Sequence, residues 1–164
     1  MSANPNPMDA PYPGMKAYPA KYFHWKEVAC HHCGKFPEKE TLESFEFKLI
    51  ASIAFAIRVE VGRPLIVSSW YRCENHPLEA VKRRPGVHTT GLAIDVLIRH
   101  GEVIRSLSVA QRAVAREYPE YDVHTRLLGI GLRQKGDVAT RFAHIDIAGL
   151  HKRFPRFRPA LWTY

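Results

Sequence analysis

Hydrophobic positions first predict a helix in the amino-terminal third of the chain. Over residues 41–61, apolar side chains recur at spacings of three and four, the pattern of one buried helix face. They are Leu42, Phe45, Leu49, Ile53 and Ile57. Gly62 and Pro64 follow directly, and both residue types end helices. We therefore expect an amphipathic helix over 41–61.

Short β-rich runs dominate the rest of the chain. The expected strands cover residues 65–71, 92–98, 127–132 and 141–147. A second helix is expected between the second and third strands, because Ser108 and Gln111 form a capping box, and it should end before Pro119. This order predicts an α+β fold, a small and mostly antiparallel sheet with helices packed on one side.

The length and composition indicate one globular domain. The chain has 164 residues, 46% of them hydrophobic and 24% charged. Five of the twelve prolines fall at positions 5, 7, 11, 13 and 19, so residues 1–20 are expected to form an extended arm and residues 21–164 a single domain. No run approaches the ~18 apolar residues of a membrane span, and a Sec signal peptide is not expected.

The charge balance favours an acidic partner. Lys and Arg number 24 against 16 Asp and Glu, a net charge of +8. Nucleic acid, an anionic membrane surface and an acidic cell-wall polymer all fit that charge. Binding of nucleic acid is not expected, because the chain lacks a basic helix or an aromatic–basic motif.

One carboxylate stands in an apolar setting. Asp95 lies in the expected strand over 92–98, where alternation makes both faces apolar. An ionised carboxylate there is costly unless it is paired or binds a metal. His88 precedes it by seven residues, and Gly91 would let the chain turn back so that the two meet. The alternative is that Asp95 bonds backbone amides and His88 is a surface residue.

The last expected strand adds a second histidine. His144 and Asp146 share one strand face, opposite Ala143, Ile145 and Ile147. Two histidines and one carboxylate are typical ligands of catalytic zinc, with the fourth position left to water. A surface His–Asp pair is the alternative interpretation.

Three separated motifs together resemble the M15 zinc peptidases. They are SSWYRC at 68–73 followed by Asn75, GVHTTGLAID at 86–95, and GIG at 129–131 with FAHID at 142–146. Trp162 near the end of the chain is also typical of that family. The resemblance covers residues 22–164 and implies the fold shared with the Hedgehog signalling domain, with a zinc cleft on the sheet. It implies one Zn²⁺ per chain on His88, Asp95 and His144, and Arg72 facing the carboxylate or scissile carbonyl of the substrate.

Three positions depart from the family pattern. The usual Ser two residues before the first histidine is Gly86, and the usual Gly after Ser68 is Ser69. Some subfamilies carry the catalytic acid three residues before the last ligand, where this chain has Arg141.

The catalytic base must therefore come from elsewhere. We assign it to Asp146; the rival role is to orient a histidine by accepting its ring N–H. Ser68 shares the strand face of Arg72 and is expected to line the same cleft.

The resemblance implies a peptidase that hydrolyses peptidoglycan stem peptides, as an L-alanyl-D-glutamate endopeptidase or a D-alanyl-D-alanine carboxypeptidase. Several members are phage endolysins. We therefore expect a monomeric bacteriolytic enzyme made in the host cytoplasm, released by a holin-type route and acting on the cell wall. The alternative is a non-catalytic, zinc-containing module that binds peptidoglycan.

The cysteines do not complete a recognisable motif. Cys30 and Cys33 have C-x2-C spacing, but there is no second pair to complete a structural zinc site. We expect buried thiols or a local structural role, with metal binding or a disulfide to Cys73 as the alternatives.

Overall fold

The computed structural model describes residues 23–99, 101–117, 119, 128–133, 136–137, 141–154 and 161–163. The expected arm over 1–20 lies outside these residues. The α-helices are α1 (Trp25–Val28), α2 (Lys39–Glu43), α3 (Phe45–Val61), α4 (Pro77–Ala80) and α5 (Val103–Glu117), with short 3-10 turns η1 (Val87–Thr90) and η3 (Ala148–Leu150). The strands are β1 (Val67–Ser69), β2 (Ala93–Leu97), β3 (Gly129–Arg133), β4 (Phe142–Asp146) and β5 (Leu161–Thr163). Within the described residues, no helix combines the length and apolar character needed to cross a membrane.

The strands form one sheet in the order β1-β2-β4-β3-β5. The pairs β1–β2, β2–β4 and β3–β4 are antiparallel, and β5 runs parallel to β3. The α+β class and the mostly antiparallel sheet are therefore confirmed. The strand β2 has neighbours on both sides, as its apolar faces predict, whereas β5 was not expected from the sequence.

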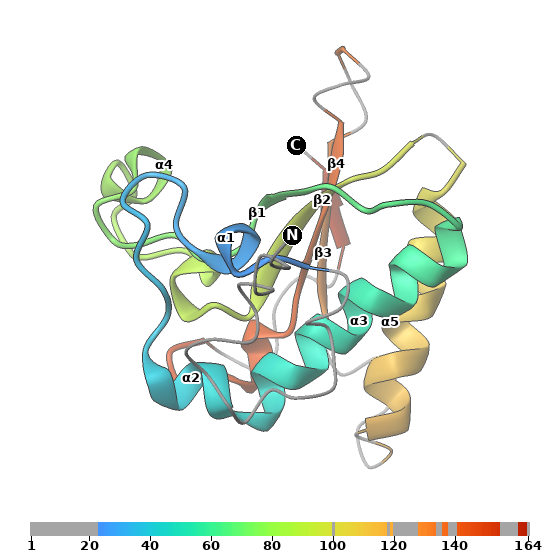
Figure 1. Cartoon of the computed structure of the whole chain (residues 1–164), viewed down its shortest axis with the longest axis horizontal. Helices are drawn as coiled ribbons and strands as arrows, with labels where there is room; N and C mark the ends of the chain where they lie inside the picture. Colours follow the sequence, from blue (N-terminus) through green and yellow to red (C-terminus); the bar gives the residue numbers. More distant parts are fainter. Residues whose placement is uncertain are drawn as a thin grey trace, which may run out of the picture.

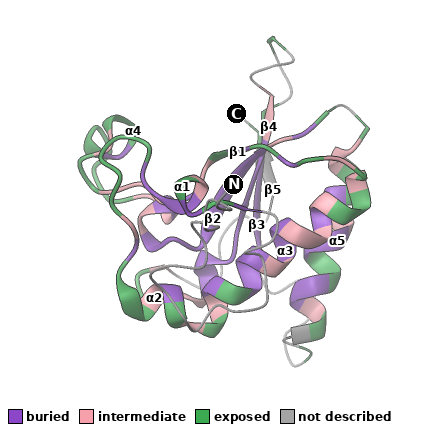
Figure 2. Ribbon diagram, viewed as in Figure 1, coloured by how far each residue is buried: buried purple, intermediate pink, exposed green. Residues whose placement is uncertain are grey.

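The two faces of the sheet differ in chemistry. Ile94 and Val96 of β2 stand beside Ile145 and Ala143 of β4, and all four belong to the hydrophobic core. That core includes residues of α3 and α5, which contact each other and lie on one side of the sheet (Figure 1). Purple segments along the strands and on the inner sides of these helices mark the buried layer (Figure 2). Alternation therefore places the polar side chains of β2 and β4 on the opposite face.

The expected helix over 41–61 is broken at Ser44. The backbone of Ser44 is extended (φ −66°, ψ 156°), and its hydroxyl accepts a hydrogen bond from the Phe47 N–H at 3.1 Å. Ser44 also donates to the Thr41 carbonyl at 2.7 Å. One residue thus caps α3 and ends α2, and Phe45, predicted to be buried, is 50% exposed. The predicted end is confirmed, because Gly62 caps α3 in the left-handed conformation (φ 66°).

Two further boundaries differ from the prediction. Helix α5 begins at Val103, not Ser108, and the Ser108 hydroxyl accepts from the Arg112 guanidinium at 2.7 Å within the helix. Its end before Pro119 is confirmed. The strand expected over 65–71 is only Val67–Ser69, because Trp70 turns into the core and donates its indole N–H to the Gly91 carbonyl at 2.9 Å.

Candidate metal centre

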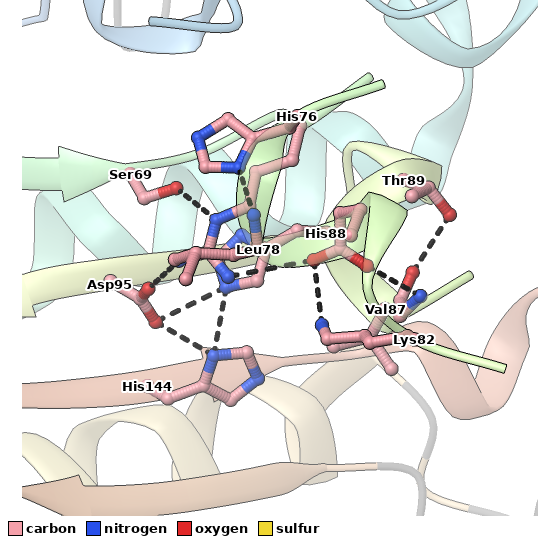
Figure 3. Close-up of polar contacts among 12 residues, drawn as sticks. Ser69, His76, Leu78, Lys82, Val87, His88, Thr89, Asp95 and His144 are labelled. Atoms are coloured by element: carbon pink, nitrogen blue, oxygen red, sulfur yellow. Dashed lines mark hydrogen bonds and ion pairs between the residues drawn. The ribbon is translucent and has the colours of Figure 1, made fainter. Parts of the chain in front are cut away.

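Three buried side chains converge on the polar face of the sheet. His88 comes from η1, Asp95 from β2 and His144 from β4, and each residue is at most 4% exposed. The Asp95 Oδ1 lies 3.2 Å from His88 Nε2 and 2.7 Å from His144 Nδ1, and the two nitrogens are 3.1 Å apart. Figure 3 shows the three side chains turned toward one another. The structure thus brings together the three residues that the sequence predicted as metal ligands.

Strand register and a tight turn create this convergence. Asp95 pairs directly with His144 across the antiparallel β2–β4 ladder, so both side chains point to the same face. Gly91 ends η1 in the left-handed conformation (φ 75°), and a Cβ there would lie 2.9 Å from Pro37. A glycine is therefore needed to turn the chain from His88 into β2, as the sequence predicts.

Hydrogen bonds on the outer side fix the orientation of both imidazoles. His88 Nδ1 lies 2.5 Å from the Trp70 carbonyl oxygen, which can only accept, so Nδ1 carries the proton. His144 Nε2 lies 3.1 Å from the Asp146 carboxylate, which assigns its proton to Nε2. The other ring nitrogen of each histidine faces Asp95 and is the one that could bind a metal. Such outer partners are typical of metal-binding histidines.

Burial and neighbouring groups favour the protonation states of His88 and Asp95 that a cation needs. Burial lowers the pKa of His88 below its usual range, and the neighbouring Asp95 charge offsets only part of that effect. Burial alone would raise the pKa of Asp95, but its contacts with His88 and His144 outweigh burial and hold it well below its usual range. The centre therefore favours a carboxylate beside neutral imidazole.

The spacing of the donor atoms suits zinc. With Zn–N bonds of about 2.0–2.1 Å, tetrahedral geometry separates neighbouring ligand atoms by about 3.3 Å. The three observed separations between donor atoms are 2.7 to 3.2 Å, slightly shorter than this value. Two imidazoles and one carboxylate leave one tetrahedral position for another molecule, as in catalytic zinc sites.

Arg72 lies beside this group and contacts it directly. Its guanidinium donates to the second carboxylate oxygen of Asp95, and its Nε donates to the Ser69 hydroxyl at 2.8 Å. The Arg72 side chain remains 12% exposed. Arg72 therefore orients Asp95 so that Oδ1 faces the histidines. A role in binding substrate stays a prediction.

Glu79 of α4 is a buried residue that the sequence analysis missed. Its carboxylate accepts from Lys82 and from the Gly86 N–H, both at 2.7 Å, and lies 3.6 Å from Arg72 Nη1. Burial would raise the pKa of Glu79, but the bonds from Lys82 and Gly86 outweigh burial and lower it. A Cβ on Gly86 would lie 2.7 Å from Glu79, so the glycine at this position permits the contact. Nothing in the local sequence pattern signals this burial.

Asp146 lies behind His144 rather than in front of the ligand group. Its Oδ2 bonds the outer His144 nitrogen, its Oδ1 accepts from the Ala148 N–H at 2.9 Å, and the residue is fully buried. Both oxygens are thus engaged on the side of the imidazole away from Asp95. This position favours the orienting role, which the sequence left as the alternative to a general base.

Ser68 and Arg141 do not join the ligand group. Ser68 is exposed and donates its hydroxyl to the main-chain carbonyl of Asp95 at 3.2 Å, while the neighbouring Ser69 contacts Arg72. Because β1 ends at Ser69, the strand alternation that grouped Ser68 with Arg72 does not continue. Arg141 donates to the Gly136 carbonyl at 3.1 Å. Position 141, three residues before His144, therefore offers no carboxylate to act as a catalytic acid.

Comparison with protein-family models, with curated proteins and with solved structures finds no match to this chain.

Proposed function

We propose that this protein is a zinc-dependent hydrolase that cleaves stem peptides of peptidoglycan. One observation carries the metal-dependent part of the proposal. Two imidazole nitrogens and a carboxylate oxygen point at one another, within 3.2 Å, in a buried site. A bound cation stabilises such an arrangement, whereas without one the two nitrogen lone pairs face each other with no proton between them.

The chain's own residues supply the support that catalysis needs. Zinc, when bound, would act as a Lewis acid and make water more acidic. Asp146 and the Trp70 carbonyl hold the two histidines in the tautomers that can bind it. Arg72 orients Asp95 and offers a permanent positive charge beside the ligand group, which would suit a substrate carboxylate or a developing oxyanion.

The substrate class rests on the sequence motifs and on charge. The M15-like motifs include Arg72 and all three ligand residues, and members of that family act on peptidoglycan peptides. The net charge of +8 suits an acidic cell-wall polymer. We propose an L-alanyl-D-glutamate endopeptidase or a D-alanyl-D-alanine carboxypeptidase, acting on the cell wall as a phage or prophage endolysin.

Mass spectrometry of defined muropeptides tests this proposal. Metal-free protein should leave the muropeptide intact, and added zinc should produce a single new pair of fragments. His144→Ala should abolish both zinc binding at this centre and cleavage. His151→Ala, a histidine outside the ligand group, is the matched control and should retain both.

A non-catalytic peptidoglycan-binding module is the second candidate. Glu79, Asp95 and Asp146 are the buried carboxylates among the described residues, and each is engaged by protein partners. The position three residues before His144, where some M15 subfamilies carry the catalytic acid, is occupied by Arg141. If zinc-loaded protein binds muropeptides in a sedimentation assay and yields no fragments, this second function is correct and the hydrolase proposal is wrong.

A further inference from the structure

The three cysteines form a second cluster of metal-binding side chains. Cys30 and Cys33 lie in the turn that follows α1, and Cys73 directly follows Arg72, forty residues further along the chain. The Sγ atom of Cys73 lies 3.6 Å from that of Cys30 and 3.5 Å from that of Cys33. All three sulfur atoms lie within 4.8 Å of one another.

These separations match a shared metal ion better than a disulfide. A disulfide bond is about 2.05 Å long and joins only two sulfur atoms. Zinc–thiolate bonds of about 2.3 Å in tetrahedral geometry place neighbouring sulfur atoms about 3.8 Å apart. Cys73 stands at close to this distance from two thiols at once, which is the arrangement of ligands around one ion.

Main-chain N–H groups converge on the sulfur atom of Cys30, as they do around thiolates. Cys30 Sγ accepts from the N–H groups of His32, Cys33 and Cys73, and Cys73 Sγ accepts from that of Asn75. The turn is closed by the Gly34 N–H, which donates to the Cys30 carbonyl at 2.7 Å, with Gly34 in the left-handed conformation (φ 71°). The three N–H groups at Cys30 stabilise negative charge on that sulfur.

We propose that Cys30, Cys33 and Cys73 bind a structural zinc ion, separate from the ion at His88, Asp95 and His144. The three thiols release their protons when the ion binds. His32, which lies between Cys30 and Cys33, and His76, which follows Cys73, are the candidates for the fourth ligand by their positions in the sequence. His76 follows Cys73 with the x2 spacing that Cys33 has from Cys30.

This second ion would tie the amino-terminal turn to the segment that carries Arg72. A single main-chain bond joins the two regions nearby, from the Tyr71 N–H to the Val28 carbonyl at 3.2 Å. Because Cys73 is the next residue after Arg72, an ion on Cys73 positions that guanidinium beside Asp95. The site does not depend on the proposed hydrolase activity, since it contributes no group to the reaction.

Metal analysis and cobalt spectroscopy test the cysteine site. Protein purified under reducing conditions should hold about two zinc ions per chain. Cys33→Ser and His144→Ala should each hold one, and the double variant none. Cobalt-substituted His144→Ala should retain the near-ultraviolet charge-transfer absorption of thiolate ligands, which Cys33→Ser should lose. His31→Ala is the matched control in the same turn and should keep both ions, whereas loss of one ion in His76→Ala or His32→Ala identifies the fourth ligand.

Two results would overturn the inference. One is wild-type protein with a single zinc ion that His144→Ala removes. The other is a cobalt derivative without thiolate absorption, combined with protection of two of the three cysteines from alkylation until a reductant is added. That combination would identify a disulfide. Neither measurement needs Cys33→Ser, so they decide the question even if that variant fails to fold. A protein that binds two zinc ions and cleaves no muropeptide would refute the hydrolase proposal and leave this site intact.

Discussion

Replacing Asp146 with Asn should weaken zinc binding by reversing a hydrogen bond. Asp146 accepts from the His144 Nε2–H and from the Ala148 N–H. Asparagine has one oxygen, so its amide N–H₂ must face one of these two donors. If the amide oxygen stays on Ala148, the N–H₂ group faces His144 and favours a proton on Nδ1, the nitrogen that faces the metal. In the opposite orientation, the Asn N–H₂ group faces the Ala148 N–H, and two hydrogen-bond donors then oppose each other.

The size of the effect follows from the buried donor. A buried polar group left without its partner costs about 1–3 kcal/mol. Loss of a carboxylate that orients a metal-binding histidine typically lowers metal affinity about 10- to 100-fold, which agrees with that range. We therefore expect Asp146→Asn to bind zinc about 10- to 100-fold more weakly, with cleavage restored to near wild-type rates at high zinc.

Zinc titration against a competing chelator, followed in parallel by muropeptide cleavage, measures both quantities. Glu43→Gln, an exposed carboxylate in an ion pair with Lys39, is the control for the loss of one negative charge and should behave as wild type. Unchanged zinc affinity together with a rate reduced about 10²- to 10⁴-fold would refute the reasoning, because that result is expected of a general base.

Three further predictions follow from the same centre. Arg72→Lys should lower kcat/KM for muropeptides while zinc content stays constant, because an ammonium group cannot reproduce the planar, forked guanidinium. Equal activity of the two proteins would show that the guanidinium has no role in the reaction. In metal-free protein the free energy of unfolding should fall as the pH drops below about 6.5, because the unfolded chain protonates His88 while burial lowers its folded pKa. His88→Gln should flatten that slope in urea titrations, and an unchanged slope would contradict the assignment. Gly86→Ala should lower the free energy of unfolding, measured by urea titration, by about 1–3 kcal/mol. The reason is that the alanine Cβ would lie 2.5 Å from Lys82 Nζ and 2.7 Å from Glu79 Oε2. An unchanged free energy of unfolding would show that these two side chains can move away at no cost.

Local sequence patterns predicted the long helices, four of the five strands and the candidate ligands, but not all of the limits of these elements. Alternation identified the faces of β2 and β4, and therefore Asp95 and His144, because both strands are regular over five residues. The break at Ser44 was missed because the apolar spacing continues through it. A serine can lie inside a helix or cap one, and tertiary packing decides between the two.

The parts of the site that depend on distant contacts could not be read from the sequence. Periodicity placed Asp146 on the face of His144, yet the side-chain rotamer decides whether the carboxylate lies in front of the imidazole or behind it. Glu79 lies in a four-residue helix, too short for its buried side to show as a pattern. The meeting of Cys73 with Cys30 joins positions 43 residues apart, which no local spacing encodes.

The central claim is that an ion held by His88, Asp95 and His144 supports hydrolysis. The most direct test is to add zinc stepwise to metal-free His31→Ala and His144→Ala proteins and to follow a defined muropeptide by mass spectrometry. The account predicts that fragments form with His31→Ala, at a rate that rises with zinc occupancy and then saturates, and that none form with His144→Ala. Cleavage that persists in His144→Ala, or zinc binding at this centre without any fragments, would contradict it.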